Sequence, residues 1–250
     1  MLSWLGWALF LFKGEGEMAH GHGGHGSCCP VKTDVEHVEG NPEAKALLRR
    51  AFEKTARWPE GFRGFSADLV CQDNGVTYKG SVQIPLPGDA AVGLEGAPEN
   101  IQKWAQNQVS MMAGHRTFRT FEMSDGRYAM TFGKEDEHPF GRQILLHGDG
   151  MNSRYRIKDD RIQQIDRATE RMKFTINIQE TMETVDHRFL STQYVVYYFS
   201  PQGQVTGVDS LTDHPVRVGD IDLPCHRRAI LAEQGEVIVR LLQFKNHVCL

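Results

Sequence analysis

The sequence predicts a mainly β (α+β) fold, in which one long antiparallel sheet curls and two helices pack on its concave face. Two helical patterns occur early in the chain, alternating apolar and polar residues dominate after Gly114, and turn signals separate the alternating stretches. Predicted strands far outnumber predicted helices, which excludes a parallel α/β sheet. One sheet of this length must curl to bury a face and to protect its edges.

The two helices are predicted from caps and spacing. Asn41-Pro42-Glu43 suits a helix start, because Asn caps, Pro fits the first turn and Glu favours the positive end of the helix dipole. Apolar residues continue at helical spacing until Trp58-Pro59 ends the pattern. The second helix is predicted over residues 98–113, with an apolar stripe formed by Ile101, Trp104, Ala105, Gln108 and Met112.

Strands are predicted from alternation and turn residues. From Gly64 to Cys71 apolar side chains share one face, Asn74-Gly75 is a hairpin signal, and a second strand follows from Val76 to Ile84. Short turn signals then separate the strands of an antiparallel meander. We predict these strands at residues 115–123, 126–133, 140–147, 152–158, 161–168, 171–180, 188–199, 204–212, 221–232 and 235–245.

Composition limits the classes of function. Apolar residues make up 40% and charged residues 24%, which is enough to form a globular core. The 28 Lys and Arg residues against 32 Asp and Glu residues give a net charge of -4, so no nucleic-acid partner is expected. Residues 41–250 are predicted to form a single domain, and residues 1–40 a flexible tail.

The first twelve residues are apolar and aromatic, and too short to span a bilayer. They predict at most a weak membrane-surface contact, or else an extension that precedes a true translation start at Met18. A cleaved secretion signal is disfavoured, because Lys13 follows the apolar run and no small-residue cleavage pattern follows it. The five cysteines indicate thiols in a reducing compartment, so we expect a cytoplasmic location.

Residues 19–30 contain a cluster of metal-ligating side chains separated by glycine. Imidazole and thiolate together suit Cu or Zn, and the predicted ligands are His20, His22, His25, Cys28 and Cys29. The spacing matches no closed structural zinc site, so opportunistic metal binding by a crowded tail is favoured over a dedicated site.

Standard catalytic motifs are absent from the sequence. An acid–base site would need scattered histidines to meet in space, namely His115, His147, His187 and His226. Aromatic residues of the meander either fill a core or line an apolar cavity, and these are Phe118, Phe121, Tyr128, Phe132, Tyr194, Tyr197 and Phe199.

Several stretches, taken in order, resemble one family. These are Gly61 to Leu69 (GFRGFSADL), Tyr78 to Val82 (YKGSV), His115-Arg116 before Phe121, Ser153 to Ile157 (SRYRI) and Met172 to Ile176 (MKFTI). Over residues 43–245 the chain resembles the cyanobacterial and plastid family called domain of unknown function 3386. The pattern also looks like the periplasmic lipoprotein carriers, and this resemblance implies a half-open barrel that holds acyl chains. The family has no established activity and implies no catalytic residue.

We therefore expect non-enzymatic binding of an apolar or amphiphilic small molecule, a lipid or a pigment, in the concavity of the sheet. The predicted ligand contacts are His115, Arg116, Trp104 and Tyr128. Two alternatives remain open: a metal-handling protein that uses the His/Cys tail, and an enzyme whose His and Arg residues converge in the cavity. The sequence does not predict the oligomeric state.

Overall fold

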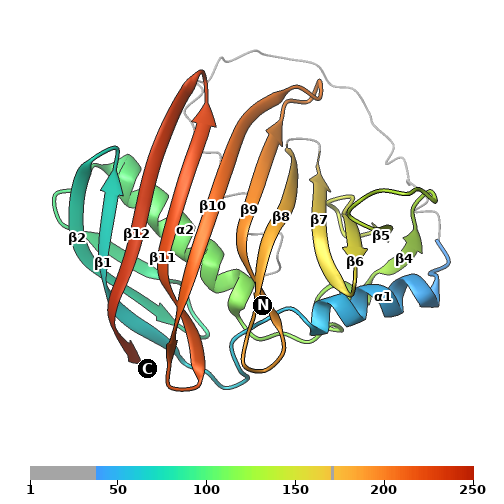
Figure 1. Ribbon diagram of the computed structural model, residues 1–250, viewed down its shortest axis with the longest axis horizontal. Coiled ribbons are helices and arrows are strands. Elements are labelled where there is room, and N and C mark those ends of the chain that lie inside the picture. The colour runs from blue at the N-terminus through green and yellow to red at the C-terminus, as the bar shows by residue number, and fades with distance from the viewer. Residues whose placement is uncertain (1–37, 170–171) are drawn as a thin grey trace, which may run out of the picture. The chain divides into compact units, whose positions relative to one another are not determined.

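The computed structural model describes residues 38–169 and 172–250 of the 250-residue chain (Figure 1). The chain divides between Val38 and Glu39, and Glu39–Leu250 contains every described helix and strand. The strands form a 12-stranded antiparallel sheet in the order β3-β2-β1-β12-β11-β10-β9-β8-β7-β6-β5-β4. The sheet is curled but not closed, because β3 and β4 are its two edges. The predicted half-open barrel is confirmed.

Consecutive strands pair with each other, except that β3 and β4, which α2 separates in the chain, lie at opposite edges, and β1 pairs with the last strand, β12. Their bounds are β1 Gly64–Asp73, β2 Val76–Pro85, β3 Ala91–Leu94, β4 Ala129–Phe132, β5 Arg142–His147, β6 Arg154–Lys158, β7 Arg161–Ala168, β8 Lys173–Glu183, β9 Phe189–Phe199, β10 Val205–Val218, β11 Ile221–Glu233 and β12 Glu236–Cys249.

Helix α1 (Pro42–Glu53) begins as its cap residues predict. The side chain of Asn41 accepts hydrogen bonds from the backbone N–H groups of Glu43 at 2.9 Å and Ala44 at 3.0 Å. Leu48 and Phe52 are buried on the face that packs against β4–β7.

Helix α2 (Glu99–Arg116) is longer than the sequence predicted, and the predicted strand at 115–123 is wrong. The hydroxyl and N–H of Thr117 both donate to the carbonyl of Ala113, at 2.8 Å each, and Arg119 Nη1 donates to the carbonyl of Gly114 at 2.9 Å. These bonds satisfy the last carbonyls of the helix, so His115 and Arg116 complete its final turn. A turn and a short 3₁₀ helix, η3 (Asp125–Arg127), then lead into β4.

The edge strand β3 was not predicted; it pairs with β2 on one side, and side chains of helix α2 bind its outer edge. Gln106 Oε1 accepts from the N–H of Val92 at 2.9 Å, and Gln102 Oε1 accepts from the N–H of Leu94 at 3.0 Å. The side chains of α2 thus cover one exposed sheet edge. On its other side β3 approaches β2 so closely that a Cβ atom at Gly80 would lie 1.7 Å from the carbonyl oxygen of Gly93.

Both helices pack on one face of the sheet, which we call the concave face, and each covers a separate core cluster (Figure 1). Under α2 lie side chains of β1, β2, β11 and β12, such as Leu69, Ile84 and Leu242. Under α1 lie side chains of β4 to β7, such as Ile144 and Tyr155. The centre of the sheet therefore lies between two helix-covered ends.

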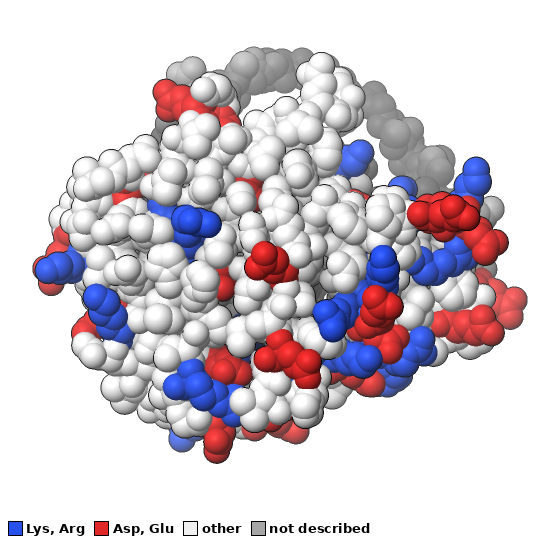
Figure 2. Space-filling model, viewed as in Figure 1, with Lys and Arg blue, Asp and Glu red and all other residues white. Residues whose placement is uncertain are grey.

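Charged side chains form no large patch of one sign on the face shown in Figure 2. Lysine and arginine mix with aspartate and glutamate beside α1 and β4–β7, whereas the surface over β8–β12 is largely uncharged. Within the described part of the chain, neither helix has the length and apolar character needed to cross a membrane.

Candidate ligand-binding site

The candidate site is an apolar strip on the concave face of β8–β11, which we call the central strip. Register places Ile176 opposite Val196 and Phe174 opposite Tyr198, so alternate residues of β8 and β9 form rows across this face. The strip consists of Phe174, Ile176, Tyr194, Val196, Tyr198, Leu211, Ala229 and Leu231, and Trp104 of α2 packs at its border.

The central strip differs from the two end clusters in how well it is covered. Of its residues, Val196, Leu211 and Ala229 are buried, whereas the aromatic rings and the two other aliphatic side chains are only partly buried. The clusters beneath α1 and α2 each contain ten or more buried residues. The strip is thus apolar surface that neither helix fully covers.

A buried ion pair borders the strip on the side of α2. Arg227 is 2% exposed and donates from Nε and Nη2 to the two carboxylate oxygens of Asp213, at 2.7 and 2.6 Å. Its guanidinium also donates to Gln108 Oε1 of α2 at 2.9 Å and to the Tyr194 hydroxyl at 2.7 Å. Burial raises the pKa of Tyr194 to about 12, so the phenol is neutral near pH 7. Arg227 thereby connects α2, β9, β10 and β11.

A second polar group borders the strip on the side of α1. The buried Arg167 donates from Nη2 to the Tyr155 hydroxyl at 2.6 Å, and that hydroxyl donates to Asp125 Oδ2 at 2.9 Å. Asp149 also forms an ion pair with Arg167, with 3.9 Å between Oδ2 and Nη1. Tyr155 is connected to the strip through Ile165, which pairs with Ile176.

One carboxyl group lies within the strip itself. Tyr198 donates from its hydroxyl to Asp209 Oδ2 at 3.1 Å, and Asp209 pairs with Val196 in the sheet. Burial raises the pKa of Asp209 to about 6, because removal from water disfavours the charged form. This carboxyl adds a titratable group to an otherwise apolar surface.

Two arginines, Arg57 and Arg119, form what we call the cationic group, and their charges act on His115. Arg57 and Arg119 both lie near the ring of Phe52, with their Cζ atoms 3.7 Å and 5.9 Å from its centroid. His115 reaches solvent, yet the protein around it lowers its pKa to about 4, first by desolvation and then through the charges of Arg119 and Arg227. His115 is therefore neutral near pH 7.

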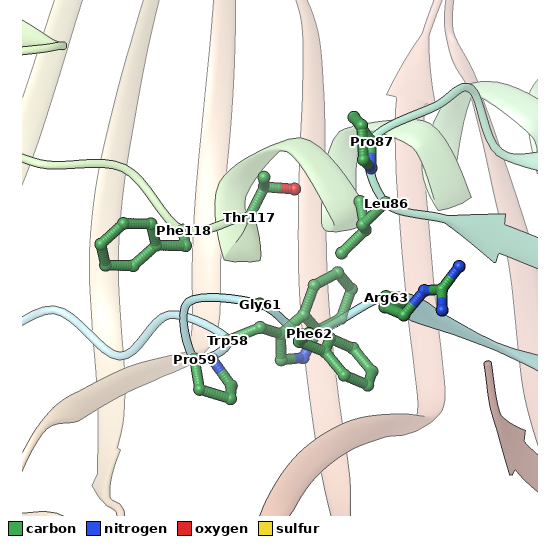
Figure 3. Close-up of a pocket in the computed structure, with 9 residues that line it drawn as sticks. All are labelled: Trp58, Pro59, Gly61, Phe62, Arg63, Leu86, Pro87, Thr117 and Phe118. Atoms are coloured by element: carbon green, nitrogen blue, oxygen red, sulfur yellow. The ribbon is translucent and has the colours of Figure 1, made fainter.

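A separate pocket of about 420 Å³ opens beyond the last turn of α2 (Figure 3). Figure 3 shows the rings of Trp58 and Phe62 next to Leu86, with Phe118 on the opposite side and the guanidinium of Arg63 directed away from them. The pocket lining is mainly apolar. Its volume lies within the range of about 300–1,000 Å³ that is typical of small-molecule sites.

The predicted contact residues are only partly brought together. His115 and Arg116 end α2, and Trp104 lies on the same helix at the border of the strip. Arg116 Nη2 donates to the carbonyl of Asp222 at 3.2 Å, with its Cζ 5.6 Å from the ring of Trp58. Tyr128 instead packs against the cluster beneath α1.

The scattered histidines do not assemble an acid–base site in the described residues. His147 is hydrogen-bonded to Thr131, with 2.8 Å between Nε2 and Oγ1, and His187 contacts Glu183 at the surface. The ring of His226 lies 5.7 Å from that of His214. Two of the four predicted histidines, His115 and His226, have a lowered pKa, and desolvation is the first cause for each.

Sequence reasoning missed the arginines of the concave face. Arg227 alternates with Ala229 and Leu231, so its position on an apolar face was a readable signal. Arg57 and Arg119 carried no such signal, because each lies in a segment without regular structure. Tyr194 and Tyr197 were predicted together as core or cavity-lining residues, but strand alternation places them on opposite faces.

The predicted metal ligands His20, His22, His25, Cys28 and Cys29 lie outside the described residues. Within the described ranges, no group of three or more His, Cys, Asp and Glu side chains is arranged to hold a metal ion. The metal hypothesis thus depends on the N-terminal residues alone.

Comparison with known proteins gives a family but no activity. The family model described as "Protein of unknown function (DUF3386)" matches residues 39–250. No curated protein shows significant similarity to the chain. A solved structure from Vibrio parahaemolyticus, described as an outer membrane lipoprotein-sorting protein domain, shares 11% identity at a TM-score of 0.39. The match covers 82% of this chain and 93% of that one, and at this level of similarity it does not indicate what this chain binds.

Proposed function

Because the chain belongs to the DUF3386 family of proteins of unknown function, we propose from the site itself that it binds an apolar or amphiphilic small molecule, a lipid or a pigment, along the central strip. The proposal is one of binding and carriage. The described histidines make separate contacts and suggest no shared reaction centre.

One observation carries the proposal: the incomplete burial of the central strip between two well-buried clusters. Covering apolar surface contributes roughly 25 cal/mol per Å². The partly buried rings of Phe174, Tyr194 and Tyr198 therefore favour an apolar molecule laid over them. The polar groups at the border are held by protein partners, which leaves the apolar rows as the binding surface.

The test uses N-phenyl-1-naphthylamine, an uncharged probe whose fluorescence increases in apolar surroundings. We expect saturable binding to the full chain and a strong loss in Ile176→Asn, which places an amide in the strip. The matched control is Val239→Asn, because Val239 lies on the other face of the sheet and is 40% exposed. That control should bind the probe as the unchanged chain does.

A third variant separates the strip from the pocket beside α2. Phe118, which is 38% exposed, lines that pocket and not the strip. If Phe118→Asn abolishes probe binding while Ile176→Asn preserves it, the pocket is the site and the proposal is wrong. The absence of saturable binding to the unchanged chain would also contradict it.

The length of an aliphatic competitor tests the driving force. Each buried methylene contributes about 0.8 kcal/mol, so dodecanol should displace the probe about 15-fold more effectively than decanol. An equal effect of the two alcohols would show that burial of the chain does not drive binding.

A further inference from the structure

One carboxyl group interrupts the apolar rows of the central strip. Asp209 of β10 pairs with Val196 of β9 on one side and with Leu231 of β11 on the other. Val196 in turn pairs with Ile176 of β8, so these four side chains form one row across the concave face. Asp209 is partly buried. A molecule laid along this row therefore contacts its carboxyl group directly.

The carboxyl group of Asp209 has unused capacity for hydrogen bonds. Its Oδ2 accepts from the Tyr198 hydroxyl at 3.1 Å, whereas its Oδ1 accepts from no residue in the described part of the chain. An ionised carboxylate offers about four acceptor positions. A single neutral donor thus leaves most of them free for a donor that a ligand brings.

The titratable groups next to Asp209 on this face supply no positive charge. Tyr194 and Tyr198 of β9 are neutral near pH 7, because burial raises the pKa of both phenols. Glu233 of β11 adds a negative charge that acts on Asp209. The strip residues of β8 are apolar, and Trp104 of α2 carries no charge.

The arginines of the concave face are held by other partners. Arg227 donates to both carboxylate oxygens of Asp213. Arg240 of β12 donates from Nε to Asp73 Oδ1 at 2.7 Å. On the side of α1, Arg167 belongs to the polar group described above. Among the described residues, none of these arginines forms an ion pair with the carboxyl group in the strip.

The result is a carboxylate that is partly removed from water and has no counterion in the described residues. Burial therefore raises the pKa of Asp209 to about 6. Near pH 7 the group is still mainly ionised, and its charge is unfavourable in apolar surroundings. A positive group placed beside it would offset this cost.

We propose that the molecule bound along the central strip is an amine-bearing amphiphile, whose protonated amine pairs with Asp209 while its apolar chain covers the neighbouring rows. This inference rests on the proposed function and adds the chemical class of the ligand and the residue that selects it. An ammonium group has three N–H donors and stays charged up to about pH 10, so it suits the free acceptor positions.

The experiment compares dodecylammonium, dodecanol and dodecanoate as competitors of N-phenyl-1-naphthylamine on the full chain at pH 8, each below the concentration at which it aggregates. The tails are equal in length, so the head group alone differs. We expect dodecylammonium to displace the probe about tenfold or more effectively than dodecanol, and dodecanoate to be the weakest. In Asp209→Asn the preference for the ammonium should shrink toward unity, while dodecanol still displaces the probe.

The pH dependence distinguishes a contact with Asp209 from general attraction to a negatively charged protein. The ammonium keeps its charge between pH 5 and 8, so any change comes from the protein. The preference should fall as the pH drops through about 6, the pKa of Asp209. Tyr198→Phe removes a hydrogen bond that favours the ionised carboxyl and should move this fall to higher pH. A purely structural role of Asp209 would not produce that shift.

Two variants control for charge at other places. Asp220→Asn removes an exposed carboxylate from the turn between β10 and β11, with the same change in net charge, and should keep the full preference. Glu233→Gln should also keep the preference. It should move the fall to lower pH, because the charge of Glu233 raises the pKa of Asp209.

The outcomes distinguish the two proposals. If neither the probe nor dodecanol binds, the proposed function fails. If dodecanol binds as tightly as dodecylammonium, or dodecanoate binds most tightly, the head-group assignment is overturned and the binding function stands. If the preference survives in Asp209→Asn, another group holds the amine and the inference is wrong. The comparison of head groups on the unchanged chain needs no variant, so misfolding of a variant cannot protect the proposal.

Discussion

The buried ion pair between Arg227 and Asp213 should make a large contribution to stability, and Asp213→Asn tests it. The substitution keeps the size of the side chain and removes its charge, leaving Arg227 buried without a counterion. Removing one partner of a buried pair costs about 3–5 kcal/mol. The side chain of Asp213 is 22% exposed and that of Arg227 is 2% exposed. Because water reaches one partner, we expect the low end, about 3 kcal/mol.

The loss is measured as a free energy of unfolding by urea denaturation, followed by circular dichroism. For a domain of this size each kcal/mol shifts the Tm by roughly 2–4 °C, so Asp213→Asn should unfold about 6–12 °C lower. The matched control is Asp160→Asn, in which the same chemical change breaks ion pairs with Arg50 and Lys54 that are 53% and 46% exposed. This control should cost less than about 1 kcal/mol.

Two results would refute the reasoning. One is an equal loss in Asp213→Asn and Asp160→Asn, which would show that burial adds nothing to the pair. The other concerns Asp213→Leu combined with Arg227→Met, which removes both charges and should be more stable than Asp213→Asn. A less stable double variant would mean that the hydrogen bonds to Gln108 and Tyr194, and not the uncompensated charge, dominate the loss.

Three further predictions follow from the same structure. Between about pH 4 and 6.5 the folded chain binds fewer protons at His115 than the unfolded chain, so this residue makes the free energy of unfolding rise with pH. At Asp209, whose pKa is raised to about 6, the folded chain binds more protons than the unfolded chain, so this residue makes the free energy of unfolding fall between about pH 4 and 6. Urea titrations across this range should therefore show a steeper rise in Asp209→Asn and a flatter one in His115→Gln, and identical slopes would contradict both assignments. Gly80→Ala should lower the Tm because its Cβ would meet the backbone of β3, whereas Gly93→Ala, whose Cβ meets no atom within 4 Å, should have little effect. If the N-terminal histidines and cysteines bind Cu or Zn, the metal measured by elemental analysis should be lost on deletion of residues 18–30, and its retention would exclude them as ligands.

The arrangement of the sheet was predictable because local signals determine it. Alternation in β8 and the turn residues between neighbouring strands specify hairpins, and hairpins in sequence give a meander. The strand β7 has the predicted bounds, whereas α2 extended three residues past the predicted helix end. That error arose because the end of α2 is fixed by Thr117 and Arg119, whose bonds back to the helix have no simple sequence signature.

The candidate site was less predictable, because it depends on contacts between distant segments. The hydrogen bond from Arg227 to Gln108 joins residues that are 119 positions apart. Of the four predicted contacts, Trp104 packs at the border of the central strip, whereas Tyr128 belongs to another cluster. The cationic group brings Arg57 next to Arg119 only because the chain crosses the end of α2, where the N–H of Trp58 donates to the carbonyl of Arg116 at 2.6 Å.

The polar groups around the central strip also explain why its apolar side chains stay accessible. A curled sheet with an apolar concave face tends to close over itself, because burial of that face is favourable. Closure here would take the ion pair of Arg227 and Asp213, of which Asp213 is 22% exposed, further out of water, and burial of charged groups is costly. The hydrogen bond from Arg227 to Gln108 also holds α2 at one side of the strip. The ion pair that borders the strip therefore opposes its collapse, so Asp213→Leu combined with Arg227→Met should bury the strip more fully and weaken binding of the probe.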